Sequence, residues 1–264
     1  MIAKIELEGA QRWVVKRDGD VFLCPEGLSN AQLLSGDFAP GAKLADDIPL
    51  SFLPPILPGA RIFCVGKNYQ AHSIEMGGEA PADPMMFTRF DESFVGHHGT
   101  IAHAGISEEH DYEGELVAVL GSGGRHLDLA TAAEALSGLT LAVDGSIRDF
   151  QKHSLFAGKN FEQSGALGPW IVPASGASDL SAITLETEID GELRQTGCPR
   201  DFIHPLPKII AYLSRVLTLR AGDMISTGSP AGVGAGFDPP RWLKRGNAIK
   251  VRATGLEPLE VRVT

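Results

Sequence analysis

Short stretches in which hydrophobic and polar residues alternate recur along the chain, a pattern typical of β-strands. The pattern predicts strands near the N-terminus at residues 2–7, 13–16 and 21–23, with a hairpin turn at residues 17–20. Further strands are predicted at residues 62–66, 85–90, 165–172, 182–189, 192–195, 224–226, 248–251 and 259–263. Helical periodicity is limited to residues 28–34, 129–136 and 207–219, with one or two further turns within residues 67–78. We therefore predict an α+β chain that is mainly β, with a few short helices.

A proline-rich stretch interrupts this pattern at residues 50–59, with the sequence LSFLPPILPG. Such a stretch is typical of a connector, because proline lacks the N–H that regular structure uses. We therefore predict a small β-rich N-terminal domain at residues 1–55 and a larger domain at residues 56–264.

The composition agrees with a globular fold. A chain of 264 residues with 43% hydrophobic and 21% charged residues is long enough for a sizeable core. Its 31 glycines and 17 prolines indicate many turns, which fits a fold rich in strands and loops.

The net charge limits the classes of binding partner, and the cysteines indicate the cellular compartment. A net charge of −10 argues against nucleic acid or an anionic membrane as a partner, although not against an anionic substrate. Three widely spaced cysteines fit a reducing compartment and predict no disulfide framework. With charged residues near the start and no apolar run of membrane-spanning length, the expected localisation is cytoplasmic.

The main candidate for chemistry is a set of three carboxylates. Glu113 and Glu115 are two residues apart, so in a strand they point to the same face. Asp144 ends a second apolar run, and the three side chains converge if the two strands are neighbours. Two carboxylates about 6 Å apart repel by roughly 3 kcal/mol at an effective dielectric of about 20, which a cation would offset. Oxygen ligands suit Mg²⁺ or Mn²⁺ better than zinc.

A simpler interpretation is that Glu113 and Glu115 line the solvated face of an amphipathic strand. The Glu-x-Glu pattern alone favours that interpretation, whereas Asp144 followed by Arg148 and Gln151 favours a site. The histidines at positions 97, 98, 103 and 110 match no familiar metal-site spacing, and we expect them to be solvated loop residues.

Two further segments carry candidate residues. His72 and Glu75 are three apart, on one face of a helical turn, as either a general base with its orienting carboxylate or a surface ion pair. Gly77 and Gly78 follow as a potential hinge, so this segment is a candidate lid. The glycine-rich loop at residues 227–236 either presents N–H groups and the Thr227 hydroxyl to an anion or is a tight connection. It lacks the lysine of a nucleotide-binding P-loop.

Several motifs follow one another along the chain. They are VGKNYQAH (65–72) with Glu75, DYEGEL (111–116), DGSIRDFQ (144–151), GKNF (158–161), LGPW (167–170) and GDMISTGSPAGVG (222–234). Together these motifs resemble the fumarylacetoacetate hydrolase superfamily, and they occur in the family's order over about residues 60–264. The segments around Phe87 and Asp144 resemble the branch of 2-hydroxyhepta-2,4-diene-1,7-dioate isomerases and acylpyruvase-like enzymes.

The resemblance implies a fold, a partner and a set of roles. The fold would be a distorted β-roll of mixed strands, usually in a homodimer. The implied metal ligands are Glu113, Glu115 and Asp144, which would bind Mg²⁺ or Mn²⁺. His72 and Glu75 would activate a water, and Lys159 would lie near metal and substrate. The implied substrate-binding residues are Arg148, Gln151 and Thr227.

The implied activity is hydrolysis of a C–C bond in a 2,4-dioxo acid of the acylpyruvate or fumarylacetoacetate kind. The same site would serve an isomerase, a hydratase or a decarboxylase of related 2-oxo or 2-hydroxy dienoic acids or of oxaloacetate. A non-catalytic, metal-binding small-molecule binder is the alternative from a different class. A nicotinamide oxidoreductase is disfavoured, because no strand–GxGxxG–helix unit is present.

Overall fold

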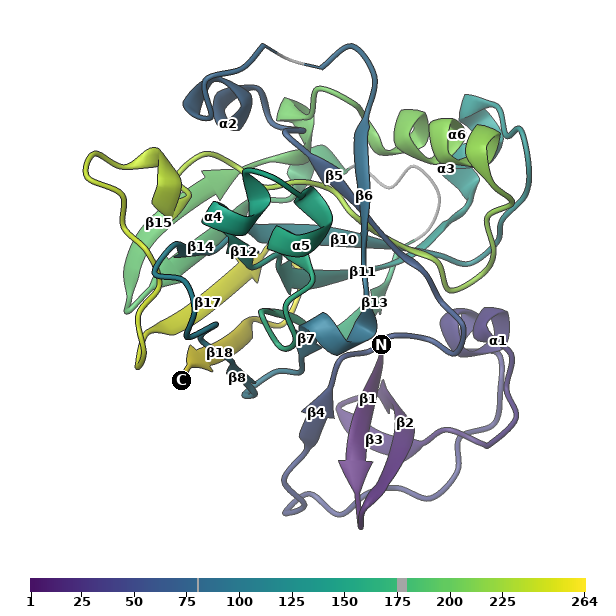
Figure 1. Ribbon diagram of the computed structural model, residues 1–264. Helices are drawn as coiled ribbons and strands as arrows, with labels where there is room; N and C mark the ends of the chain where they lie inside the picture. Colours follow the sequence, from purple (N-terminus) through teal and green to yellow (C-terminus); the bar gives the residue numbers. More distant parts are fainter. Residues whose placement is uncertain (80, 175–179) are drawn as a thin grey trace.

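A computed structural model describes residues 1–79, 81–174 and 180–264. Its elements form three sheets with short helices around them (Figure 1). Both antiparallel and parallel pairs occur. The parallel pairs are β16 (Met224–Ser226) with β5 (Ile62–Gly66), β13 (Gly165–Pro173) with β7 (Phe94–Val95), and β18 (Leu259–Val263) with β8 (Thr100–Ile101). The fold is therefore mixed and mainly β, as the sequence pattern predicts.

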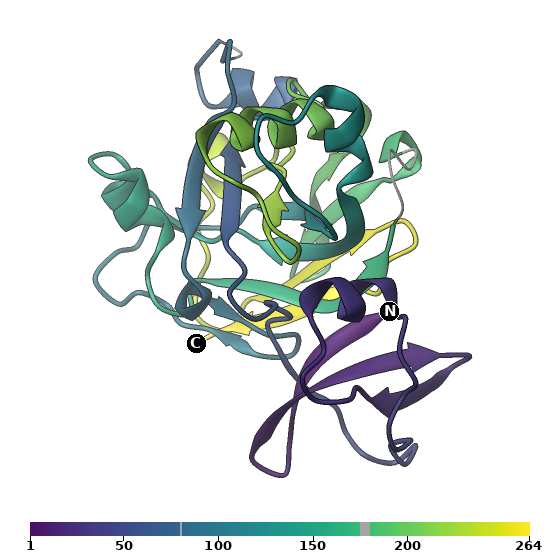
Figure 2. The ribbon, with the colours of Figure 1, turned by 90° about the vertical axis from the view of Figure 1, so that its right-hand side faces the viewer.

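The N-terminal segment is a small antiparallel unit. Asp18 and Gly19 both adopt positive φ, at 50° and 89°, which closes the hairpin between β2 and β3. Strand β1 also pairs with β13, so this unit continues the large sheet. Figures 1 and 2 show it at the opposite end of the molecule from α2 (Gln70–Glu75). Its elements are β1 (Ile2–Leu7), β2 (Ala10–Arg17), β3 (Asp20–Leu23), α1 (Asn30–Ser35) and β4 (Ser51–Leu53).

The stretch at residues 50–59 is not only a connector, because β4 lies within it and pairs with β1. The prolines follow this strand, where no ladder N–H is needed. The division into domains at residue 55 remains a prediction.

The large sheet has the strand order β3-β2-β1-β13-β11-β10-β16-β5-β6, with β4 beside β1 and β7 beside β13. Every residue of β10 is buried, which matches its continuous apolar run after Glu115. The other strands are β5 (Ile62–Gly66), β6 (Met85–Arg89), β7 (Phe94–Val95), β10 (Gly114–Leu120), β11 (Leu136–Val143), β13 (Gly165–Pro173) and β16 (Met224–Ser226).

A five-stranded sheet of order β15-β14-β17-β18-β8 packs against the centre of the large sheet. Leu116, Leu141, Leu185 and Val251 belong to one buried cluster that joins the two sheets. A third sheet pairs β9 with β12 beside the ends of β10 and β11. These strands are β8 (Thr100–Ile101), β9 (His110–Asp111), β12 (Ser146–Ile147), β14 (Leu185–Ile189), β15 (Glu192–Gly197), β17 (Ala248–Ala253) and β18 (Leu259–Val263).

The helices are short. The longest described helix, α6, buries Leu206, Ile209, Ile210 and Leu213 on one face. In the part of the chain that is described, no helix is long and apolar enough to cross a membrane. The helices outside the N-terminal unit are α2 (Gln70–Glu75), α3 (Leu129–Glu134), α4 (Arg148–Gln151), α5 (Leu155–Lys159) and α6 (Leu206–Val216), with 3-10 turns at Asp91–Ser93, Leu180–Ala182, Pro199–Asp201 and Gly234–Gly236.

Candidate metal centre and lid

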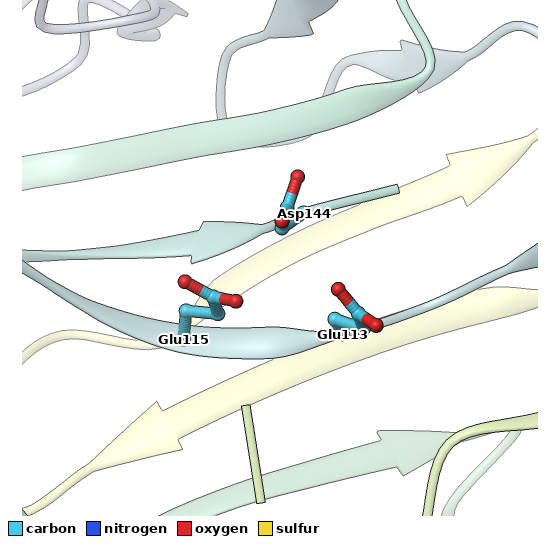
Figure 3. Close-up of side chains that lie close together, drawn as sticks. All are labelled: Glu113, Glu115 and Asp144. Carbon is cyan, nitrogen blue, oxygen red and sulfur yellow. The ribbon is translucent and has the colours of Figure 1, made fainter. Parts of the chain in front are cut away.

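Two neighbouring strands bring three carboxylates together. Gly114 pairs with Val143, so Glu113, just before β10, and Glu115, its second residue, lie beside Asp144, which directly follows β11. One oxygen from each of the three carboxylates lies within 4.8 Å of the others, and all three residues are buried. Figure 3 shows the side chains facing a common space. We call this group the carboxylate cluster.

Three buried cations surround the cluster. The Lys159 ammonium donates to Glu113 and, at 2.6 Å, to Asp144. Arg148 donates to Glu113 at 2.6 Å, and Arg89 donates to Asp144 at 2.6 Å. Burial alone would raise the pKa of Glu113, but Lys159 and Arg148 hold it well below its usual range.

Glu115 has different partners. Its Oε2 accepts from the Ser226 hydroxyl at 2.5 Å and from the Gly228 N–H at 3.0 Å, both of which are neutral donors. Within the described residues it forms no ion pair with a lysine or arginine. Burial, together with the charges of Asp144 and Glu113, raises its pKa well above the usual value.

The charges and donor types fit a hard divalent cation. Arg148 also pairs with the buried Asp111 at 2.8 Å, so three buried cations face four carboxyl groups, and Glu115 is the one that has no cationic partner among the described residues. A carboxylate oxygen that accepts one hydrogen bond keeps a second lone pair for a metal. Oxygen donors alone favour Mg²⁺ or Mn²⁺ over softer metals. The assignment of the cluster as metal ligands remains a prediction.

The candidate lid, α2 with Gly77 and Gly78, places an imidazole over the cluster. His72 Nδ1 lies 3.0 Å from Glu75 Oε2, and His72 Nε2 lies 3.9 Å from Glu113 Oε1. The ring is buried, so the pair is not a surface ion pair. The spacing of three residues produces this contact because both side chains project from one face of the helix.

A cavity of about 210 Å³ collects most of the predicted site residues. Gln151 accepts from Arg148 at 2.9 Å, and both line this cavity. Thr227 is buried outside the lining, where its hydroxyl donates to the Leu116 carbonyl at 2.8 Å. Glu75 is not among the lining residues, although it contacts His72, which is. The predicted residues that line the cavity are His72, Glu113, Glu115, Asp144, Arg148, Gln151 and Lys159.

The glycine-rich loop at residues 227–236 does bind anions, and those anions are the protein's own carboxylates. The Gly228 N–H donates to Glu115, and the Gly232 N–H donates to Glu75 at 2.8 Å. The Gly234 and Ala235 N–H groups donate to Asp111 at 2.6 and 3.1 Å. One loop therefore contacts both the lid and the carboxylate cluster.

Two buried partners were not predicted from the sequence. Arg89 lies in the motif that resembles the isomerase branch, but its partner Asp144 is 55 residues away along the chain. Asp111 is the first residue of the DYEGEL motif, so the resemblance draws attention to it. Its spacing from Arg148 along the chain, however, does not predict the hydrogen bond between them. Both pairs depend on how distant strands meet.

The expectation that His110 is a solvated loop residue is wrong. The residue is fully buried in β9, which pairs with β12, and its Nε2 lies 3.2 Å from the Ser164 carbonyl oxygen. Burial lowers the pKa of His110 to about 4, so the ring stays neutral in the folded protein. A histidine with no apolar pattern around it gives no sequence signal of such burial.

Comparisons with known proteins agree with the resemblance. Residues 61–264 match the family described as fumarylacetoacetate (FAA) hydrolase, C-terminal. The oxaloacetate tautomerase YisK of Bacillus subtilis (strain 168) is 40% identical over 199 residues, which are 74% of this chain and 66% of that protein.

Solved structures extend the likeness to the fold. The fumarylacetoacetate hydrolase from psychrophilic Exiguobacterium antarcticum has a TM-score of 0.85 and 32% identity, over 100% of this chain and 98% of that one. The fumarylpyruvate hydrolase from Pseudomonas aeruginosa, solved in complex with Mn²⁺ and pyruvate, has a TM-score of 0.70 and 30% identity, over 86% of this chain and 98% of that one.

Proposed function

The chain belongs to the fumarylacetoacetate hydrolase family, and we propose that it is a divalent-metal-dependent enzyme that cleaves a C–C bond in a 2,4-dioxo acid. Mg²⁺ or Mn²⁺ would be held by Glu113, Glu115 and Asp144. The proposal rests above all on the position of His72 Nε2, which lies 3.9 Å from Glu113 in the cavity that the carboxylates line.

The reaction needs a base beside an electron-accepting centre. Water adds to the C4 carbonyl of the substrate, the C3–C4 bond breaks, and C3 departs as the enolate of pyruvate. When bound, the divalent ion would supply positive charge that stabilises the enolate oxygen. A proton then returns to C3, so the products are a carboxylic acid and pyruvate.

The protein's own side chains would move and hold the protons. His72 Nε2 takes the proton from water, while Glu75 accepts from Nδ1–H and fixes the ring's tautomer. Lys159 is buried, and Asp144 and Glu113 more than offset the effect of burial, so the pKa of Lys159 is raised and the ammonium stays charged. It would stabilise negative charge that develops on the substrate. Arg148 and Gln151 would contact the substrate carboxylate.

A second candidate is keto–enol tautomerisation of a 2-oxo diacid such as oxaloacetate. The observation that favours it is the 40% identity to a protein named oxaloacetate tautomerase. Tautomerisation needs His72 to shift a proton at C3 and needs no water. The two reactions therefore differ in whether His72 acts on water or on carbon.

A substrate panel separates the candidates. Acylpyruvates, oxaloacetate and 2-hydroxyhepta-2,4-diene-1,7-dioate should be assayed with Mg²⁺ and with Mn²⁺, following pyruvate release and the loss of enol absorbance in parallel. Pyruvate release from an acylpyruvate supports hydrolysis, whereas enol loss from oxaloacetate without acylpyruvate cleavage supports the tautomerase.

The His72→Ala variant tests the proposed base. Hydrolysis should fall by about 10² to 10⁴-fold, the usual contribution of a positioned acid or base, whereas decarboxylation of oxaloacetate should persist. Unchanged hydrolysis would reduce His72 to a structural residue. Metal binding without turnover on any of these acids would support the non-catalytic binder.

A further inference from the structure

The contact between the lid and the glycine-rich loop carries an inference about positioning. Glu75 uses its two oxygens differently: Oε2 contacts His72, and Oε1 accepts from the Gly232 N–H at 2.8 Å. The orientation of the imidazole is therefore linked through one carboxylate to the backbone of residue 232. That residue is 157 positions away along the chain.

The loop leaves space for this carboxylate only where a side chain is missing. A Cβ built on Gly236 would lie 2.7 Å from Glu75 Cγ, and its three nearest atoms all belong to Glu75. Gly236 does not adopt the left-handed conformation that favours glycine, so its backbone gives no reason to exclude alanine. The space for the Glu75 carboxylate is what alanine would remove.

The loop is itself held in place from the other side. The Tyr112 hydroxyl donates to the Gly232 carbonyl at 3.1 Å, and Asp111 accepts from the Gly234 and Ala235 N–H groups. Asp111 also holds Arg148. The backbone that contacts Glu75 is therefore fixed by residues next to the carboxylate cluster.

Local interactions within the lid do little to stabilise its helix. Helix α2 has six residues, and its N-cap residue, Tyr69, makes no side-chain capping hydrogen bond. Such a short helix is marginal by itself, so its position depends on tertiary contacts.

We propose that Gly232 and Gly236 are positioning residues for the His72–Glu75 pair. The Gly232 N–H holds the carboxylate, and the missing side chain at position 236 provides its space. Neither glycine is among the residues that line the cavity. The inference rests on the proposed role of His72 as the base, and it adds that the loop fixes the orientation of that base.

The first test is the Gly236→Ala variant of the full chain. Its kcat should fall about 10 to 100-fold, because the added methyl displaces Glu75, while KM and the affinity for Mn²⁺ change less than about twofold. In a Glu75→Ala background the same substitution should have no further effect, because the overlapping side chain is gone. Gly41→Ala is the matched control: residue 41 is exposed, has no positive φ and lies in the N-terminal segment.

The second test does not depend on turnover. Hydrogen exchange over residues 70–78 should be faster in Gly236→Ala than in the wild type, with residues 114–120 unchanged. If Gly236→Ala does not fold, Glu75→Ala/Gly236→Ala is compared with Glu75→Ala, and the two should be equally stable and exchange equally.

The inference would be overturned if the effects of Glu75→Ala and Gly236→Ala were independent of each other. It would also be overturned if Gly236→Ala had the same hydrogen exchange and the same kcat as the wild type. If the wild type lacks metal-dependent turnover, the proposed function fails. The exchange measurement still decides whether the loop holds the lid.

Discussion

The carboxylate cluster and the lid meet in one cavity but are held in place by different means. The cluster lies at the ends of β10 and β11, whose pairing fixes Glu113, Glu115 and Asp144 relative to one another. Buried cations then bind two of its three members. The lid is a six-residue helix whose Glu75 contacts the loop through the Gly232 N–H.

Because of this difference, substitutions in the two regions should affect different quantities: metal affinity for the cluster and the reaction rate for the lid. Substitutions in the cluster change the charge of a buried, rigid network, so they should alter metal affinity and the free energy of unfolding together. Substitutions in the lid should alter the orientation of a base and leave metal affinity unchanged. The predictions below test this separation, starting with the largest expected effect.

Removal of two cluster carboxylates should have the largest effect. Glu113→Ala/Glu115→Ala should lower metal-dependent turnover by at least about a thousandfold, because charge stabilisation by a bound ion is worth several kcal/mol. Titration calorimetry with Mn²⁺ should show no binding. Glu26→Ala, at an exposed position, is the control. Turnover that persists in EDTA would remove the metal hypothesis.

In the lid, His72→Asn should reduce kcat for hydrolysis by about a hundredfold, as expected for loss of a positioned base. The affinity for Mn²⁺ should change by less than about twofold, because His72 is not among the carboxylates. A parallel loss of Mn²⁺ affinity would show that the two regions are not separable.

Lys159→Met tests the charge balance of the cluster. It leaves Glu113 and Asp144 without their shared cation, so the free energy of unfolding in EDTA should fall by about 3 kcal/mol. Mn²⁺ should stabilise this variant more than the wild type, measured by urea unfolding. Lys152→Met is the control, because its partner Glu109 forms only an exposed pair and the expected change is below about 1 kcal/mol. Equal losses in the two variants would contradict the prediction.

The smallest expected effect is on the pH dependence of stability, through His110 in β9. Burial lowers the pKa of His110 to about 4, so the folded state favours the neutral ring. The contribution of the neutral His110 ring to the free energy of unfolding is complete above about pH 6.5. It is lost as the pH falls towards 4, because the histidine of the unfolded chain takes up a proton first. In EDTA, the free energy of unfolding of His110→Gln should therefore fall by about 1 to 3 kcal/mol less than that of the wild type over this pH range. The exposed His126→Gln is the control, and an unaltered pH profile in His110→Gln would refute the assignment.

Features with a short period could be predicted from the sequence. Glu113 and Glu115 share a face because side chains alternate along any strand, and His72 and Glu75 meet because three residues nearly complete a helical turn. Most of the strands follow from local alternation. The ordered motifs over about residues 60–264 were sufficient to identify the family and its fold class.

Some local elements were nevertheless missed. Helices α4 and α5, with four and five residues, are too short for a periodic pattern to establish. Strand β4 has three residues within a proline-rich stretch. In each case tertiary packing stabilises a segment whose own sequence gives little preference.

Only the tertiary structure decided which charges are paired. It places Arg89 on Asp144, leaves Glu115 with neutral donors, buries His110 and turns the Thr227 hydroxyl to the β10 backbone. It also brings Gly232 to Glu75. Alternation and helical spacing depend on the geometry of neighbouring residues, so one sequence reveals them. Burial and ion pairing depend on which distant strands meet, and that information is spread over the whole chain.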